Sequence, residues 1–256
     1  MKWIVRTGLA AMALLLFMFR NAHTQKLERQ TIKLKANKPF KPFEMLFISD
    51  LHRRKIPEKL IDFEVDIIVI GGDLAEKDVP LDRIEHNLRL LKKSAPVYFV
   101  WGNNDREVGE DQLRDILKRT GVQTLENESV ELFGEEKLKL VAIDYFAYKT
   151  NAMENTFADV QADDTVIFVS HTPFVFKRVK EKYPVDFMLA GHTHGGQIRF
   201  GKFGIYEKGE YIDQDGVKEL ISNGFGTTQL PLRLGAEAQY HLFSIGPDIS
   251  EDERSE

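Results

Sequence analysis

The chain has no cysteine among its 256 residues. Disulfide bonds, thiolate zinc sites and cysteine nucleophiles are therefore excluded. Positive charge is not in excess either, because 35 lysine and arginine residues face 40 aspartate and glutamate residues and the formal net charge is −5. Proteins that bind the nucleic-acid backbone usually present a basic surface, so we expect no nucleic-acid partner. Nothing in the sequence predicts a protein partner.

The length and composition suit one sizeable domain with short appendages. Hydrophobic residues make up 43% of the chain and charged residues 29%, which is typical of a globular protein rather than a disordered one. We divide the chain into an N-terminal membrane anchor or signal segment over residues 1–28, a globular domain over residues 29–246, and an acidic flexible tail over residues 247–256.

An unbroken apolar run, GLAAMALLLFMF, covers residues 8–19 between Arg6 and Arg20. It is as long as the core of a signal peptide and shorter than the roughly 20 residues that cross a bilayer comfortably. A good cleavage site is missing, because Arg20 stands two positions before Ala22 where a small residue is needed. We favour an uncleaved membrane anchor; a cleaved signal and a buried helix are the alternatives.

The segment after the run is basic, with seven lysine or arginine residues from Arg20 to Lys41 against Glu28 alone. Basic residues beside a membrane segment favour the cytoplasmic face and anionic lipid, by about 1 kcal/mol each near the surface. Lys2 and Arg6 compete from the other end of the run. We expect a cell-membrane protein with a single N-terminal anchor and its catalytic domain on the cytoplasmic side. The alternative is a solvated, charged first strand.

Five short apolar runs end abruptly in polar residues, and they cover residues 44–50, 66–73, 96–105, 164–171 and 185–194. They are too short for typical helices and rich in β-branched or aromatic residues, so we expect strands buried on both faces. Helical patterns lie over residues 81–91, after Pro80, and over residues 111–120, before Gly121. The alternation predicts right-handed βαβ units and a largely parallel sheet.

The later part of the chain changes character. SVELF and KLKLVAID resemble paired strands, Asp215-Gly216 marks a hairpin, and residues 239–245 read as a last strand. These features predict an α/β (α+β) fold with two mixed sheets packed together and helices outside.

Potential metal ligands follow every one of the five apolar runs. In open α/β sheets, sites form beyond the carboxyl ends of the strands, so we expect these side chains at one edge of one sheet. They comprise two carboxylates, four imidazoles and one amide oxygen: Asp50, His52, Asp73, Asn103, His171, His192 and His194.

Seven ligands exceed the about four to six positions of one ion and suit two ions that share a carboxylate. Two ions about 3.5–4 Å apart can clamp the attacking and leaving oxygens of a displacement at phosphorus. Glycines beside the ligands, such as Gly102 and Gly191, permit sharp turns and close backbone approach. The alternative is that these are unrelated cap and turn residues.

The motifs SDLH, GGD, GNND, SHTP and GHTH, in this order, resemble those of the calcineurin-like metallophosphoesterases over roughly residues 44–245. The resemblance implies a four-layer α-β-β-α sandwich and a metal-dependent phosphohydrolase of the phosphodiesterase or pyrophosphatase type. It also implies that a hydroxide shared by the two ions attacks phosphorus. One ion is then held by Asp50, His52, Asp73 and His194, and the other by Asp73, Asn103, His171 and His192.

Two longer segments, GHTHGGQI and NGFGTTQLPLRLG (residues 223–235), resemble a membrane-associated branch that includes UDP-diacylglucosamine pyrophosphatases. That resemblance implies a lipid-linked pyrophosphate or phosphodiester substrate. Phe146, Tyr148 and Phe157 could line a lipid-facing cap, and core packing is the alternative. Rival functions are a nucleotide phosphodiesterase or phosphatase of the same family, whose groove would lack apolar walls, and a non-catalytic metal-binding scaffold.

One residue departs from the family pattern. Many members read GNH followed by Asp or Glu, and that histidine helps to protonate the leaving group; here Asn104 and Asp105 follow Asn103. Losing a general acid typically lowers the rate by about 10²–10⁴, and least when the leaving group is already acidic. We therefore expect a preference for pyrophosphates or activated diesters, with Asn104 and Asp105 on the leaving-group side.

Imidazole and carboxylate ligands suit manganese, iron or zinc better than calcium or magnesium, and we expect two divalent ions, manganese first. Arg106 and Arg199 are candidates for bidentate contacts to a substrate phosphate, with solvated charge as the alternative. His241 falls in the last predicted strand, where we expect it to pack rather than to bind metal.

Overall fold

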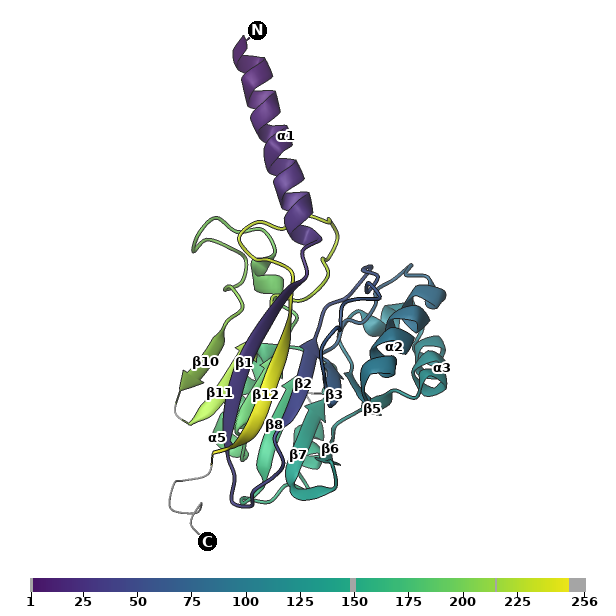
Figure 1. The fold of residues 1–256 in the computed structure, drawn as a ribbon, viewed down its shortest axis with the longest axis vertical. Helices are drawn as coiled ribbons and strands as arrows, with labels where there is room; N and C mark the ends of the chain where they lie inside the picture. The colour runs from purple at the N-terminus through teal and green to yellow at the C-terminus, as the bar shows by residue number, and fades with distance from the viewer. Residues whose placement is uncertain (1, 148–150, 215, 249–256) are drawn as a thin grey trace.

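The computed structural model describes residues 2–147, 151–214 and 216–248 (Figure 1). A long helix, α1 (Lys2–Ala22), projects from one end of a body built on two six-stranded sheets. The first sheet has the order β1 (Lys26–Lys35), β12 (Gln239–Asp248), β2 (Phe43–Ile48), β3 (Ile67–Ile70), β4 (Val97–Val100) and β5 (Gln123–Leu125). The second has the order β10 (Tyr211–Gln214), β11 (Val217–Ile221), β9 (Phe187–Ala190), β8 (Thr165–Ser170), β7 (Glu135–Ile143) and β6 (Glu128–Leu132).

Both sheets are mixed, as predicted. Strands β2 to β5 run parallel, while β12 is antiparallel to β2 and parallel to β1. In the second sheet β7, β8, β9 and β11 run parallel, and the two edge strands β6 and β10 are antiparallel to their neighbours. The predicted hairpin is therefore present as β10 and β11, although Asp215 itself lies outside the described residues.

Helices cover the outer face of each sheet, which completes the four predicted layers. Helices α2 (Leu81–Ser94) and α3 (Glu110–Thr120) pack with the first sheet, and α4 (Ala152–Thr156) and α5 (Phe176–Lys182) with the second. Helix α2 starts directly after Pro80, and α3 ends at Gly121, which has a left-handed backbone.

The continuous apolar character of the central strands follows from this layering. In β2, Leu46 and Ile48 face the helices, whereas Met45 and Phe47 face the core between the sheets. In the same inner core the rings of Phe187 and Phe243 meet edge to face, with centroids 5.1 Å apart. Because both faces of such strands are shielded from water, their sequences do not alternate between apolar and polar residues.

Three further expectations meet the structure here. Strand β12 continues to Asp248, two residues beyond the expected end of the globular domain at residue 246, and the domain boundaries stay predictions. His241 is buried, with Nε2 3.0 Å from Ser222 Oγ, so it packs between elements as expected. Of the three aromatics proposed for a lipid-facing cap, Phe146 is exposed, Phe157 is core, and Tyr148 lies outside the described residues.

Helix α1 is attached to the body only at its C-terminal end. The backbone N–H of Arg233 donates to the carbonyl oxygen of Met18, and the Arg54 guanidinium donates to the carbonyl oxygens of His23 and Thr24. The part of the helix that precedes Met18, residues 2–17, is exposed. Its 21 residues extend about 30 Å, and by length and composition it can cross a membrane; a signal sequence meets the same criteria.

Candidate metal centre

The predicted ligands converge where the carboxyl ends of the two sheets meet. Asp50, His52, Asp73 and Asn103 follow β2, β3 and β4 of the first sheet, whereas His171, His192 and His194 follow β8 and β9 of the second. The expectation of one edge of one sheet was therefore wrong. Hydrophobic pattern identifies strands and their ends, but it does not reveal which strands pair.

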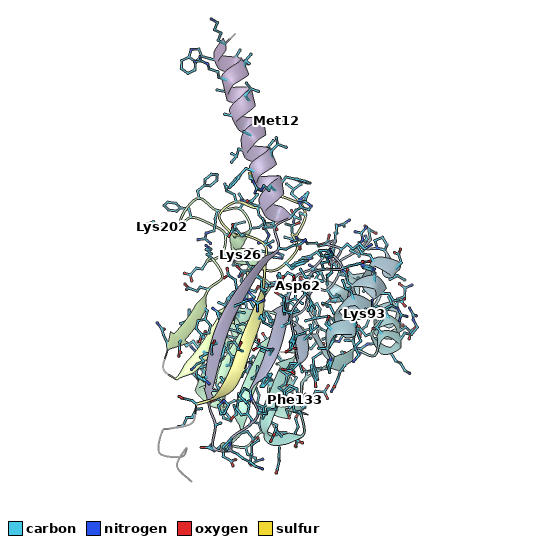
Figure 2. The ribbon with its side chains drawn as sticks, viewed as in Figure 1. Met12, Lys26, Asp62, Lys93, Phe133 and Lys202 are labelled. Carbon is cyan, nitrogen blue, oxygen red and sulfur yellow. The ribbon has the colours of Figure 1, made fainter. Side chains whose placement is uncertain are left out.

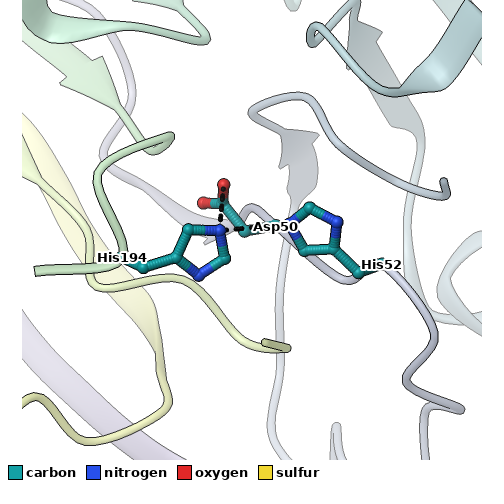
Figure 3. Close-up of side chains that lie close together, drawn as sticks. All are labelled: Asp50, His52 and His194. Atoms are coloured by element: carbon teal, nitrogen blue, oxygen red, sulfur yellow. Dashed lines mark hydrogen bonds and ion pairs between the residues drawn. The ribbon is translucent and has the colours of Figure 1, made fainter. Parts of the chain in front are cut away.

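The first cluster combines one carboxylate with two imidazoles (Figure 3). His194 Nε2 lies 3.4 Å from Asp50 Oδ1 and 3.1 Å from His52 Nε2. All three side chains are buried. Their ligand atoms lie within 4.8 Å of one another, close enough to share one ion.

The second cluster surrounds His171. Its Nε2 lies 3.3 Å from Asp73 Oδ2 and 3.1 Å from Asn103 Oδ1. His192 Nδ1 approaches the same nitrogen to 3.2 Å. Asp73 Oδ2 also lies 3.7 Å from His52 Nε2, so one carboxylate oxygen stands between the two clusters. This is the position that a bridging ligand requires.

The donor set fits two divalent cations. Ionised carboxylates offer only acceptors, a neutral imidazole offers one acceptor nitrogen, and here these atoms face one another at 3.1–3.7 Å inside the protein. Facing acceptors repel unless a proton or a cation lies between them, and a buried charge without a partner is unfavourable. Cations held at the two clusters would give these facing atoms shared partners.

The backbone at the ligands is strained in a regular way. Asp50, His52, Asp73, His192 and His194 all have positive φ, between 50° and 72°. Such conformations cost non-glycine residues on the order of 1–3 kcal/mol each and cluster at functional sites. The surrounding fold therefore holds these side chains in orientations that a relaxed chain would rarely adopt.

Two glycines allow the strand ends to approach closely. A Cβ atom on Gly191 would lie 2.3 Å from Asp50 Oδ2, and one on Gly102 would lie 2.2 Å from Asp73 Oδ1. Both distances are below van der Waals contact, so any larger residue would displace a carboxylate ligand.

Burial and charge divide the imidazoles into two protonation classes. Burial lowers the pKa of His194 to about 3, which leaves it neutral. Burial acts in the same direction on His171, but the neighbouring Asp73 carboxylate outweighs it and raises the pKa of His171 to about 10. Burial in turn favours the protonated form of Asp73, yet the charge of His171 keeps its pKa well below the usual range. Without metal, His171 carries a proton in the place a cation would take.

Sequence reasoning missed two side chains that hold the ligands. Glu76 Oε2 lies 3.0 Å from His52 Nδ1, in a close ion-pair contact rather than an aligned hydrogen bond, and its other oxygen contacts Arg53. Arg233 is fully buried, with Nη2 3.2 Å from His194 Nδ1. Glu76 follows the GGD motif by three residues, and Arg233 belongs to the quoted segment over residues 223–235, which were the available signals.

Asn104 and Asp105 lie next to Asp73, the candidate bridging residue. The Asn104 backbone N–H and side-chain amide donate to the two oxygens of Asp73, at 2.9 and 3.0 Å. Asp105 is fully buried and accepts hydrogen bonds from the backbone N–H groups of Asp73, Ala75 and Gly102. Burial, together with the charge of Asp73, raises the pKa of Asp105 to about 7. Their predicted role on the leaving-group side stays a prediction.

The two arginines proposed for substrate phosphate are engaged elsewhere. Arg106 pairs with Asp144 and Glu110 and lies over the Trp101 ring, 4.6 Å from its centroid. Arg199 is buried and donates to carbonyl oxygens of the segment that follows it, among them Gly201 and Tyr206. A phosphate contact by either one stays a prediction.

A cavity of about 310 Å³ opens beside the metal ligands. His192 and His194 are among the residues that line it. Ile198, Ile205 and Leu230 add apolar side chains to the lining, beside polar ones such as Thr228. A bound molecule would therefore meet both metal ligands and hydrocarbon.

We predict that Glu76→Gln weakens manganese binding by about 10–100-fold, the range typical of outer partners of a metal-bound histidine. The substitution removes the charge that orients His52. Isothermal titration calorimetry on the metal-stripped protein measures the effect. Glu85→Gln, which removes a surface carboxylate paired with Arg89, is the matched control and should bind manganese as the unmodified protein does. Equal affinities for both variants would contradict the assignment.

Manganese binding should weaken as the pH falls. Because the pKa of His171 in the metal-free protein is about 10, a cation must displace its proton throughout the neutral range. We expect apparent affinity to drop about tenfold per pH unit per displaced proton between about pH 8 and pH 6. Calorimetry in buffers of different ionisation enthalpy reports the released proton directly. Constant affinity without proton release would show that the imidazole is not a ligand.

Comparison with known proteins agrees with the geometry. The family model described as calcineurin-like phosphoesterase matches residues 43–196. The chain is 40% identical to YpbG of Bacillus subtilis (strain 168), over 93% of this chain and 95% of that protein. It is 31% identical to phosphodiesterase YaeI of Escherichia coli (strain K12), over 62% of this chain and 63% of that protein.

A more distant relative is named as a transmembrane protein that contains a metallophosphoesterase domain. The chain is 26% identical to a Bos taurus protein named transmembrane protein with metallophosphoesterase domain, over 69% of this chain and 45% of that protein. The matched family region contains all seven predicted ligands and covers more than half of the chain. The predicted resemblance is thereby confirmed: the chain belongs to the calcineurin-like phosphoesterase family and is a metal-dependent phosphohydrolase.

Proposed function

We propose that this chain hydrolyses a lipid-linked pyrophosphate or phosphodiester with two metal ions. The observation that carries the proposal is the position of Asp73 Oδ2, within 3.7 Å of His52 Nε2 and 3.3 Å of His171 Nε2. A carboxylate oxygen shared by two ligand clusters suits a binuclear centre.

When bound, two divalent ions supply a nucleophile from water at neutral pH and neutralise charge that develops at phosphorus. The chain's own residues would hold these ions and keep the Asp73 carboxylate ionised. The low pKa of Asp73 keeps its oxygens available for bridging, and Asn104 orients both of them. Glu76 lies against the imidazole of His52, and Arg233 donates to the backbone carbonyl oxygen of His194.

The apolar part of the cavity lining favours a lipid-linked substrate over a free nucleotide. Ile198, Ile205 and Leu230 line the same cavity as His192 and His194, and a polar nucleotide would leave this hydrocarbon unmatched. The name of YaeI supports diester chemistry in a relative. Manganese remains our first choice of metal, with iron and zinc as alternatives.

Helix α1 would keep the enzyme at its substrate as an uncleaved anchor in the cell membrane. The basic residues from Arg20 to Lys41 favour the cytoplasmic side for the catalytic domain. Because the chain lacks cysteine, Glu58→Cys at an exposed position provides a single label site. We expect a membrane-impermeant maleimide to label it only after cells are opened. Labelling in intact cells would place the domain outside.

The main experiment is manganese-dependent hydrolysis of bis(4-nitrophenyl) phosphate by the full chain in detergent, with Asp73→Asn beside it. We expect activity in the unmodified protein and loss to the metal-free level in the variant, because the bridging charge is gone. Asp78→Asn, at an exposed surface position, is the matched control and should stay active. Full activity of Asp73→Asn with reduced metal content would contradict a two-metal mechanism.

The rate of hydrolysis should depend on the acidity of the leaving group. Since Asn104 cannot donate a proton as an acid, we expect turnover of a sugar-nucleotide pyrophosphate and little turnover of glycerol phosphate. Asn104→His should raise the rate on glycerol phosphate by up to about 10²–10⁴ and change the pyrophosphate rate much less. Metal content is measured in parallel. Comparable rates on both substrates before substitution would refute the preference.

A further inference from the structure

Exposed apolar side chains gather around the mouth of the cavity. Phe203 is 71% exposed, Ile205 85% and Leu230 58%. We call the group the apolar rim, and it consists of Phe174, Phe200, Phe203, Ile205 and Leu230. Large apolar residues clustered on the surface of a water-soluble domain are unfavourable unless something covers them.

The rim is part of a built structure rather than a loose loop. Arg199 donates to the carbonyl oxygens of Gly195, Gly201, Lys202 and Tyr206, and so ties the segment into a closed turn. Phe200 and Phe203 exchange backbone hydrogen bonds at 2.8 and 3.0 Å. The aromatic side chains are thus presented outward on a fixed backbone.

The same structure is joined to the base of α1. The Arg199 N–H donates to the carbonyl oxygen of Leu234, and the neighbouring Arg233 N–H donates to that of Met18 in α1. Gln197 reaches the carbonyl oxygen of Leu230. Figure 2 shows Lys202 at the end of the body from which α1 projects, whereas Phe133 lies at the opposite end. The rim therefore stands beside the point where α1 leaves the body.

We propose that the apolar rim is a second membrane contact, which dips into the surface of the bilayer that α1 crosses. Aromatic and aliphatic side chains with a lysine among them are the composition that enters the interface of an anionic membrane. Lys202 supplies that charge, 5.6 Å from the centre of the Phe203 ring. The short hydrogen-bonded path from Met18 to Arg199 leaves the rim little freedom to stand away from the membrane.

This contact determines where the cavity opens. Ile205 and Leu230 belong both to the rim and to the lining of the cavity, which His192 and His194 share. A substrate could then keep its acyl chains in the bilayer while its phosphate reaches the metal ligands. This consequence rests on the proposed catalytic function, whereas the membrane contact itself rests only on the proposed anchor α1.

The decisive test measures how deeply position 203 lies in the lipid bilayer, and it does not depend on enzymatic activity. Phe203→Cys in the cysteine-free full chain is labelled with an environment-sensitive fluorophore and reconstituted in vesicles of equal parts phosphatidylcholine and phosphatidylglycerol. We expect a blue-shifted emission that quencher groups on the lipid chains extinguish. Phe133→Cys, 51% exposed at the opposite end, is the matched control and should behave as in water.

Two outcomes would overturn the proposal. Emission at position 203 as water-exposed as at position 133 would show that the rim stands free. A blue shift without quenching by lipid would show that protein, such as a second copy of the chain, covers the rim.

A second measurement links the rim to catalysis. Phe200→Ser with Phe203→Ser leaves the cavity wall intact. It should lower kcat/KM on a vesicle-embedded acylated 4-nitrophenyl phosphodiester by at least about tenfold, because the two rings that would bury their apolar surface in the membrane are removed. Turnover of soluble bis(4-nitrophenyl) phosphate should not change. Equal kcat/KM values of the double variant and the unmodified chain on the embedded probe would contradict a role of the rim in catalysis. If the unmodified chain is inactive on both probes, the proposed function is refuted, and the result of the depth measurement still stands.

Discussion

The close packing of buried carboxylates and imidazoles is the constraint on which the rest of this site depends. Asp50, His52, Asp73, His171 and His194 are all buried, and their nitrogens and oxygens face one another at little more than hydrogen-bond distance. Water is excluded from them there, and the raised pKa of His171 keeps a proton on the ring beside Asp73. Two cations bound at the clusters would displace that proton and give the facing atoms shared partners.

The fold provides the force that keeps these groups together. Two sheets bury an apolar core between them and an apolar face against each helical layer, so the carboxyl ends of their strands cannot separate. Against this frame the chain can hold five ligands at positive φ and pack two glycines against carboxylates. Stability of the layers thus supports local strain at the site, and the strain aims the ligands.

The sequence was sufficient for most of the strands, for helices α2 and α3, and for candidate ligands that the fold brings together, for a physical reason. Strands buried on both faces carry continuous apolar runs, and ligands must follow where such strands end, so both signals are local. The division of the five runs between two sheets was not predictable, because pairing depends on contacts between distant segments. Glu76 and Arg233 were missed because each contacts a histidine that only the folded chain brings to it, although Arg233 lies in the quoted segment over residues 223–235.

The sequence also did not reveal which aromatic residues are exposed on the surface. Phe157 was a candidate for a lipid-facing cap and lies in the core, whereas Phe200 and Phe203 gave no local signal and are exposed beside α1. Exposure of an aromatic residue depends on what the rest of the chain places over it. The arrangement of anchor, rim and cavity at one end of the molecule therefore emerges only in three dimensions.

The central claim is that Asp73 bridges two ions, and anomalous diffraction from crystals grown with manganese tests it most directly. Two anomalous peaks about 3.5–4 Å apart, one beside Asp50, His52 and His194 and the other beside Asn103, His171 and His192, are expected, with Asp73 Oδ2 between them. A single peak at full manganese saturation, or peaks that leave Asp73 outside ligand distance, would contradict the account.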